Sequence, residues 1–216
     1  MTAWNIKTND QPLAASRQFL KSVWAEAKLN GMVLPVQQSD QFGIRSGFIE
    51  IPDDLNTANP FAPLTLVNAG RLVADISRER PGERFAAVMR ACELRGLSEL
   101  VKNESINISN WLIIGVDCLA CFPASDFEWR VQKAGGVEPL TDLVIRNARQ
   151  GGISLSRFRL SCQMCSKPEP IQVDLCLGLL GLPVKEAMLV IPKNDLIAER
   201  FHLSEITDGL APSQLV

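Results

Sequence analysis

Tyrosine is absent from this sequence of 216 residues, and histidine occurs once, at His202. The shortage of histidine argues against catalysis by histidine general bases and against histidine-rich metal sites. No apolar run approaches the roughly 20 residues that a membrane-spanning helix needs. The formal net charge of −2 gives no electrostatic basis for binding nucleic acid. Residues 1–30 contain no basic segment followed by an apolar one, so we expect a cytoplasmic protein without a secretion signal.

The composition is that of a globular protein, with 46% hydrophobic and 21% charged residues. The length suffices for a substantial core. We expect one α/β domain over residues 1–216, with a mainly parallel sheet and flanking helices. Within it, residues 13–84 form an N-terminal helix and an irregular region, residues 85–191 form the core, and residues 207–216 form a loose tail.

Six cysteines are the most informative residues that are present. Four of them form two Cys-x-x-Cys pairs, Cys118/Cys121 and Cys162/Cys165, and Cys92 and Cys176 stand apart. A gap of two residues lets a tight turn bring both sulfurs to one metal centre. In a cytoplasmic chain, cysteines concentrated in this way indicate a metal or an iron–sulfur cluster more than disulfides.

The hydrophobic pattern predicts the elements that would carry these cysteines. Apolar residues at helical spacing predict a helix over 13–29, and short apolar runs predict strands. The predicted strands are 32–36, 85–89, 111–116, 173–177 and 187–191, and further helices are predicted at 93–103, 140–150 and 194–202. Residues 37–63 are predicted to be irregular and to wrap a surface or cover a site.

Two cysteines follow neighbouring strands of this predicted core. Strand 85–89, helix 93–103 and strand 111–116 make one βαβ unit. Cys92 comes just after the first strand and Cys118 just after the second. Ligands of open α/β sheets bind at the carboxyl edge of the strands, so the pattern predicts a cysteine site at that edge.

The spacing alone leaves three interpretations open. Cys118, Cys121, Cys162 and Cys165 could form a structural four-cysteine zinc site, although the 40-residue gap between the pairs is longer than in zinc ribbons. Cys92, Cys118, Cys162 and Cys165 could instead hold a cubane cluster, with Pro168 following as in ferredoxin-type sites. Buried small hydrophobic residues are the third interpretation, which we favour for Cys176.

The sequence segments around the cysteines resemble motifs of one known family. Residues 90–102, Arg-Ala-Cys-Glu-Leu-Arg-Gly-Leu-Ser-Glu-Leu-Val-Lys, resemble the "RPCE-x-RA-x-x-EL-x-K" segment of the coenzyme F420 hydrogenase/dehydrogenase beta-subunit family. Residues 113–118 are similar to that family's "IIGVDC", residues 162–170 to its "C-x-x-C-x-x-P-x-P", and residues 173–178 to its "AD-x-x-IG". The similarity runs in order from about residue 13 to 185.

This resemblance implies an electron-transfer flavoprotein subunit with FAD beside a [4Fe–4S] cluster. Its partner would be a hydrogenase, a formate dehydrogenase or a heterodisulfide-reductase-type subunit, and it would exchange electrons with a two-electron carrier. Carried over by position, the cluster ligands are Cys92, Cys118, Cys162 and Cys165. The chain departs from the family in lacking the ferredoxin segment, in having Ala91 where proline is usual, and in carrying the extra Cys121.

Several residues near the cysteines are predicted to contact the cofactors. Arg90, Lys102 and Lys167 are candidate cations beside an anionic cluster, whose potential depends on such neighbours. Gly178 would allow a cofactor to approach the backbone, although a turn glycine is the simpler interpretation. No Gly-x-Gly-x-x-Gly sequence occurs, so a flavin would not be held by a Rossmann fingerprint.

Overall fold

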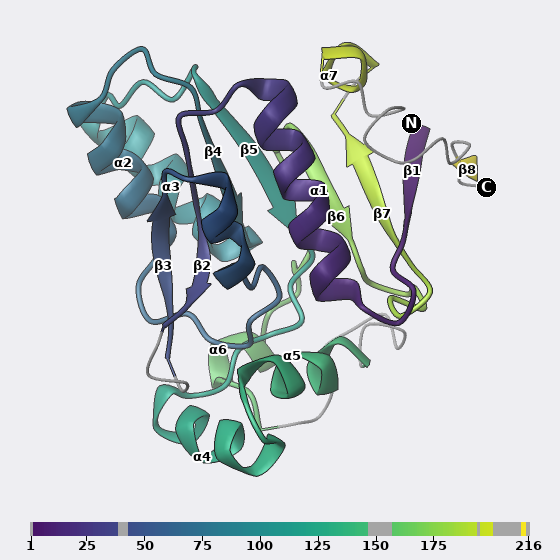
Figure 1. Cartoon of the computed structure of the whole chain (residues 1–216). Coiled ribbons are helices and arrows are strands. Elements are labelled where there is room, and N and C mark those ends of the chain that lie inside the picture. The colour runs from purple at the N-terminus through teal and green to yellow at the C-terminus, as the bar shows by residue number, and fades with distance from the viewer. Residues whose placement is uncertain (1, 39–42, 147–156, 194, 201–212, 215–216) are drawn as a thin grey trace.

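The protein is built around one mixed β-sheet with helices on both faces (Figure 1). The computed structural model describes residues 2–38, 43–146, 157–193, 195–200 and 213–214. The eight strands follow the order β3-β2-β4-β5-β6-β7-β1-β8. The predicted α/β class is therefore confirmed.

The centre of the sheet is parallel and its margins are antiparallel. The four parallel strands are β2 (Gly31–Gln37), β4 (Phe85–Met89), β5 (Trp111–Val116) and β6 (Leu175–Gly178). The antiparallel strands are β3 (Ile44–Ile49), β7 (Ala187–Pro192), β1 (Thr2–Lys7) and β8 (Ser213–Gln214). Every residue of β4 and β5 is buried, which explains their uninterrupted apolar sequences.

Seven α-helices and one 3₁₀ helix are present in the described part of the chain. They are α1 (Pro12–Ala27), the 3₁₀ helix η1 (Pro52–Thr57), α2 (Ala69–Glu79), α3 (Ala91–Glu104), α4 (Ala124–Ala134), α5 (Val137–Ile145), α6 (Leu160–Gln163) and α7 (Asp195–Arg200). No helix in the described part of the chain is both long and apolar enough to cross a bilayer.

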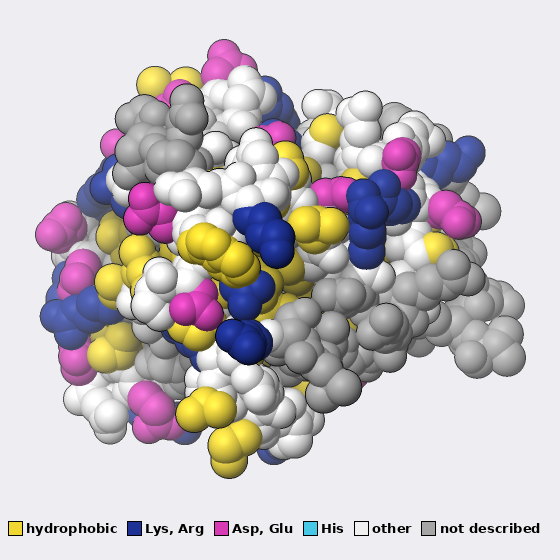
Figure 2. All heavy atoms as spheres, turned by 90° about the horizontal axis from the view of Figure 1, so that it is seen from below, with side chains coloured by type: hydrophobic (Ala, Val, Ile, Leu, Met, Phe, Trp, Pro, Cys, Tyr) yellow, Lys and Arg dark blue, Asp and Glu magenta, His cyan; other side chains and the backbone are white. Residues whose placement is uncertain are grey.

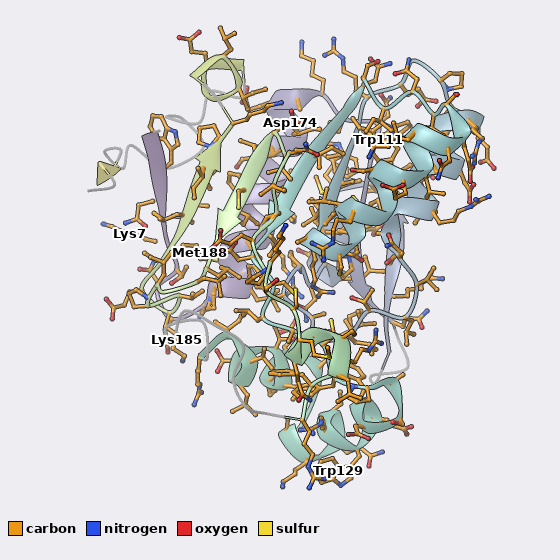
Figure 3. The ribbon with its side chains drawn as sticks, turned by 180° about the vertical axis from the view of Figure 1, so that it is seen from behind. Lys7, Trp111, Trp129, Asp174, Lys185 and Met188 are labelled. Atoms are coloured by element: carbon orange, nitrogen blue, oxygen red, sulfur yellow. The ribbon has the colours of Figure 1, made fainter. Side chains whose placement is uncertain are left out.

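The two faces of the sheet are covered unequally. On one face, α1 buries Leu20 and Val23 in a large core that includes Ile114 of β5 and Leu175 of β6. On the opposite face, α2 and α3 cover β4 and β5, with Phe85 in the smaller core. Seen from behind in Figure 3, the β6 and β7 half of that second face has none of the described helices in front of it.

Several elements depart from the prediction. Residues 37–63 were predicted to be irregular, but they contain β3 and η1. The strand β1 and the helices α2 and α4 were not predicted. Of the predicted loose tail, Ser213–Gln214 form β8 beside β1, and the rest lies outside the described residues. The predicted helix over 140–150 is observed as α5, with 147–150 outside the described residues.

Candidate metal centre

Two cysteines lie at the carboxyl edge of the central strands, as predicted. The register that pairs Met89 with Gly115 makes β4 and β5 end side by side. The chain leaves β4 directly into α3, which carries Cys92 in its first turn, and it leaves β5 through Asp117 and Cys118. Neighbouring parallel strands therefore deliver both cysteines to the same edge.

The second cysteine segment is bound to the first by backbone hydrogen bonds. The amide of Arg159, just before α6, donates to the carbonyl of Cys121 at 2.9 Å, and the amide of Cys118 donates to the carbonyl of Pro168 at 3.0 Å. The ring of Pro170 lies directly against Gly115 of β5. Residues 118–121 and 159–170, which are far apart in the sequence, thus form one loop cluster.

The thiols of Cys118, Cys121 and Cys162 in this loop cluster interact with one another and with Cys92 of α3. The thiol of Cys162 donates a hydrogen bond to the sulfur of Cys121, which also lies 3.5 Å from the hydroxyl of Thr65. Electrostatic interactions further connect Cys118 with both Cys121 and Cys92. Cys121 is buried, Cys118 and Cys162 are half-buried, and Cys92 is exposed. The structure therefore assembles thiols from three chain segments.

Backbone amides also point at these sulfurs. The amide of Ala120 donates to the sulfur of Cys118, and the amide of Cys121 donates to the sulfur of Cys162. Ala120 has a φ of +74°, which is uncommon for a residue with a side chain. Amide donors stabilise negative charge on sulfur, so this backbone suits thiolates.

One hydrogen bond shifts the pKa values of two of the thiols in opposite directions. The Cys162 hydrogen bond lowers the pKa of Cys121 below its ordinary value, and the same bond raises the pKa of Cys162. Burial raises the pKa of Cys118 to about 11, although Arg90 acts in the opposite direction. Cys121 is therefore the thiol among these three that ionises most readily.

A buried cation lies among the sulfurs. Arg90 is only 4% exposed, and its guanidinium donates to the hydroxyl of Thr65 and to the carbonyls of Ala62 and Leu64. Burial lowers the pKa of Arg90, but the nearby Cys121, Glu93 and other thiols outweigh burial and raise it overall. Arg90, which was predicted to be a cation beside the cofactor, thus lies near the thiols of Cys121, Cys118 and Cys92.

Glu93 forms part of the support for Arg90. Its carboxylate is 2% exposed and accepts a hydrogen bond of 2.9 Å from the Arg90 amide at the start of α3. Burial raises the pKa of Glu93, and the charge of Arg90 lowers it in part. A carboxylate in the first turn also interacts favourably with the helix dipole.

Three other predicted site residues, Lys102, Lys167 and Cys165, are less closely involved with the thiols than Arg90 is. Lys102 lies in the last turn of α3, where its ammonium pairs with Glu99 at 3.4 Å. Lys167 is exposed and lines a hollow of about 350 Å³ between α3 and the 166–172 segment. Cys165 is half-buried, and its thiol makes no hydrogen bond with any described residue.

Gly178 and Cys176 face a larger cavity beside the loop cluster. This cavity has a volume of about 630 Å³ and lies on the half of the sheet that α2 and α3 leave open. Its walls are mostly apolar, with Leu189 and Ile191 of β7 opposite Gly178. Such a volume and lining are typical of sites for small molecules and cofactors.

Asp117, Thr65 and Arg159 belong to the site and were not predicted. The carboxylate of Asp117 accepts hydrogen bonds from the amides of Leu179 and Leu180 at 2.8 and 3.1 Å, which ties the end of β5 to the chain after β6. Arg159 donates to the carbonyl of Thr65 at 2.6 Å. A cation three residues before Cys162 was a usable signal, whereas nothing in the sequence points to Thr65.

The residues fit an anionic metal–thiolate centre. Four thiols, amide donors to sulfur and a buried guanidinium supply ligands, hydrogen bonds and compensating charge for such a centre. Among the described residues, no three cysteine, histidine, aspartate or glutamate side chains are arranged as they would be around a bound ion. The fit therefore rests on the types of donor and on their proximity.

Comparison with known proteins gives a likeness of fold. No family model matches this sequence. No curated protein matches it either. Among solved structures, one chain in "Xenon derivatization of the F420-reducing [NiFe] hydrogenase complex from Methanosarcina barkeri" is similar, with a TM-score of 0.64 and 10% sequence identity. The alignment covers 98% of this chain and 80% of that one. At this identity the match supports the predicted resemblance at the level of the fold.

Proposed function

We propose that this protein is an iron–sulfur electron-transfer subunit that holds one [4Fe–4S] cluster at the carboxyl edge of β4 and β5. The observation that carries the proposal is the buried guanidinium of Arg90 among thiols from three separate chain segments. Burying a cation without compensating negative charge is strongly unfavourable, and ionised thiols would supply this charge together with Glu93. The proposed ligands are Cys92, Cys118, Cys162 and Cys165.

The surrounding groups have defined roles in this proposal. When bound, a cluster of this kind supplies one-electron transfer. Arg90 compensates the negative charge of the thiolates, and the amide of Ala120 donates to one of them. Glu93 and the carbonyl of Ala62 hold Arg90 in position. Hydrogen bonds and cations near sulfur make the potential of such a centre less negative.

The cavity beside Gly178 is the proposed site for FAD. Its volume of about 630 Å³ and apolar walls suit a flat aromatic ring system. Asp117, Glu169 and Pro170 line the cavity and belong to the same loops as the cysteines. A flavin there would exchange single electrons on one side and electron pairs with a carrier on the other.

An exposed apolar surface supports association with a redox partner of the hydrogenase, formate dehydrogenase or heterodisulfide-reductase type. Leu160 and Met164 of the second cysteine segment are 75% and 82% exposed, and Trp129 of α4 is 57% exposed. Figure 2 shows the end of the molecule that bears α4 to α6, where hydrophobic side chains lie beside lysines and arginines. Exposed apolar groups at this end are typical of a protein–protein interface. The similar chain belongs to a hydrogenase complex, which agrees with a subunit role.

The proposal is tested on protein purified without oxygen. Iron, sulfide, zinc and flavin are quantified per chain, and absorbance spectra are recorded before and after dithionite. We expect about four irons per chain and a broad band near roughly 400 nm that bleaches on reduction. A colourless protein with no iron after reconstitution with iron and sulfide would contradict the proposal.

A structural zinc site is the second candidate function. Its ligands would be Cys118, Cys121, Cys162 and Cys165, and the hydrogen bond between Cys121 and Cys162 favours it. Cys92 lies outside this set, so Cys92→Ala separates the two candidates. Loss of iron in this variant supports the cluster, whereas one zinc per chain in both the variant and the parent protein supports the zinc site.

A further inference from the structure

We propose that Cys121, in place of Cys165, is the fourth thiol ligand of the centre, together with Cys92, Cys118 and Cys162. The inference rests on the proposed cluster site and changes one of its ligands. Carrying ligands over by sequence position selects Cys165 because Cys121 is an extra residue there. The structure favours Cys121 for three independent reasons.

The first reason is the turn that carries Cys121. Ala120 adopts a left-handed φ of +74°, and its amide donates to the sulfur of Cys118. This conformation is unfavourable for a residue that carries a Cβ atom, so the surrounding contacts must hold it. The turn is fixed on both sides, since the amide of Cys118 donates to the carbonyl of Pro168 at 3.0 Å and the amide of Arg159 donates to the carbonyl of Cys121 at 2.9 Å. A two-residue gap folded in this way brings two sulfurs toward one centre.

The second reason is the surroundings of the Cys121 sulfur. It is hydrogen-bonded to the thiol of Cys162, and it interacts electrostatically with Cys118 and Cys92. Cys121 is 4% exposed, so its sulfur is directed into the loop cluster. The burial of this sulfur and its 3.5 Å contact with the Thr65 hydroxyl place it inside the loop cluster.

The third reason is the arrangement of the cations. Arg90 and Arg159 both interact with the Cys121 sulfur, and Thr65 hydrogen-bonds to both Arg90 and that sulfur. Two positive charges and a hydroxyl around one buried sulfur provide the compensation that a buried thiolate needs.

Cys165 lacks these features. It follows α6 in a turn between Met164 and Ser166, which are both exposed. Its amide donates to the carbonyl of Cys162 at 3.2 Å, while its thiol forms no hydrogen bond within the described part of the chain. A half-buried thiol beside solvent is better suited to remain free than to close a protected centre.

The test compares five single alanine variants with the parent protein, all purified without oxygen and reconstituted with iron and sulfide. Iron per chain, the absorbance spectrum and the electron paramagnetic resonance spectrum of the reduced protein are measured. We expect Cys121→Ala, Cys92→Ala, Cys118→Ala and Cys162→Ala to lose iron at least about tenfold, because outer contacts alone change metal affinity by 10- to 100-fold. Cys165→Ala is expected to keep the iron content and spectra of the parent.

Controls separate loss of a ligand from loss of the fold. Cys176→Ala alters a half-buried cysteine in the cavity beside the centre and is expected to keep its iron. Circular dichroism and thermal unfolding establish which variants are folded. Should Cys121→Ala fail to fold, Cys165→Ala still decides the question, since its substitution lies at the surface.

The outcomes distinguish this inference from the proposed function. Iron retained in Cys121→Ala and lost in Cys165→Ala would overturn the inference and leave the cluster in place. Absence of iron from the parent protein would overturn the proposed cluster and the inference together. Zinc that is lost in Cys165→Ala and kept in Cys92→Ala would also overturn both the cluster and the inference, and it would favour the zinc site.

Discussion

At the scale of single residues, Arg90 places a permanent charge in a region from which solvent is excluded. Its guanidinium donates to Thr65 and to the carbonyls of Ala62 and Leu64, so its removal would leave these carbonyls without a donor. We predict that Arg90→Met lowers the free energy of unfolding by about 3 kcal/mol, because buried partners would lose both charge and hydrogen bonds. Urea denaturation measures this change.

Arg95→Met is the matched control for Arg90→Met. Arg95 lies on the exposed side of α3, and its substitution is expected to change the free energy of unfolding by less than about 0.5 kcal/mol. Equal effects of the two substitutions would contradict the structural role assigned to Arg90.

A second prediction at this scale concerns pH. The side-chain nitrogens of Arg80 contact the carboxylate of Glu83 at 2.8 and 2.6 Å, and these hydrogen bonds lower the pKa of Glu83 below its ordinary value of 4.5. A pKa that is lower in the folded state means that the ionised form favours folding. The contribution is complete above about pH 4.5 and is lost as the pH falls through the folded-state value.

We therefore predict that Glu83→Gln lowers the Tm near neutral pH and that the difference from the parent shrinks as the pH falls below 4.5. Thermal unfolding followed by circular dichroism over a pH series measures both curves. Glu79→Gln, on the exposed side of α2, serves as the control and should give a difference without this pH dependence. A Glu83→Gln difference that grows toward low pH would reverse the assigned sign.

At the scale of elements, β5 and the second cysteine segment meet at Gly115. A Cβ atom at this position would lie 2.6 Å from the Pro170 ring and 3.0 Å from the side chain of Val173. We predict that Gly115→Ala lowers the free energy of unfolding by about 1–3 kcal/mol, because the segment must shift to relieve the overlap. Since the carbonyl of Pro168 holds the amide of Cys118, the same shift should reduce iron retention.

Gly178→Ala provides the control in the neighbouring strand. A Cβ atom there would find its nearest neighbour, the Cβ of Leu189, at the ordinary distance of 3.4 Å. This variant should keep the stability and the iron content of the parent, as measured by denaturation and metal analysis. An equal loss in both variants would show that close packing against Pro170 is not the cause.

The elements that could be predicted are those whose sequence pattern depends on burial alone. β4 and β5 were predicted with the residues that they contain, because both of their faces are buried and their sequences are continuously apolar. β3 was missed because its burial alternates and Gly47 interrupts it. β1 was missed because a strand near the margin of a sheet depends on its partner β7, which is remote in the sequence.

Part of the candidate site could be predicted from the sequence, namely the edge of the sheet at which it lies. The βαβ pattern placed Cys92 and Cys118 at one edge, and Arg90 was identified by its position before Cys92. The roles that we propose for Cys121 and Cys165 could not be predicted from spacing. They depend on the left-handed φ of Ala120 and on the contacts of Arg159, which only the folded chain displays.

At the scale of the whole molecule, the open half of one sheet face contains the proposed flavin cavity. Leu189 of β7 lines this cavity, and none of the cysteines proposed as ligands does. We predict that FAD raises the Tm of the parent protein, since a ligand at 100 times its Kd stabilises by about 2.7 kcal/mol. Leu189→Trp would fill the cavity and should abolish this increase while leaving the iron content unchanged.

Thermal unfolding with and without added FAD, together with iron analysis, checks this prediction. Leu143→Trp, at an exposed position on α5, is the matched control and should respond to FAD as the parent does. The same increase in Tm in Leu189→Trp as in the parent would place the flavin elsewhere.

The order of the strands in the sheet also bears on how the chain acquires its structure during translation. β1 pairs with β7, so Trp4 meets Val190 only after all the residues between them have left the ribosome. All the cysteines proposed as ligands precede β7 in the sequence. Contacts this distant in sequence form slowly. Insertion of the proposed cluster and closure of the sheet are therefore separable in time, and we expect that the nascent chain can bind this cluster before β1 pairs with β7.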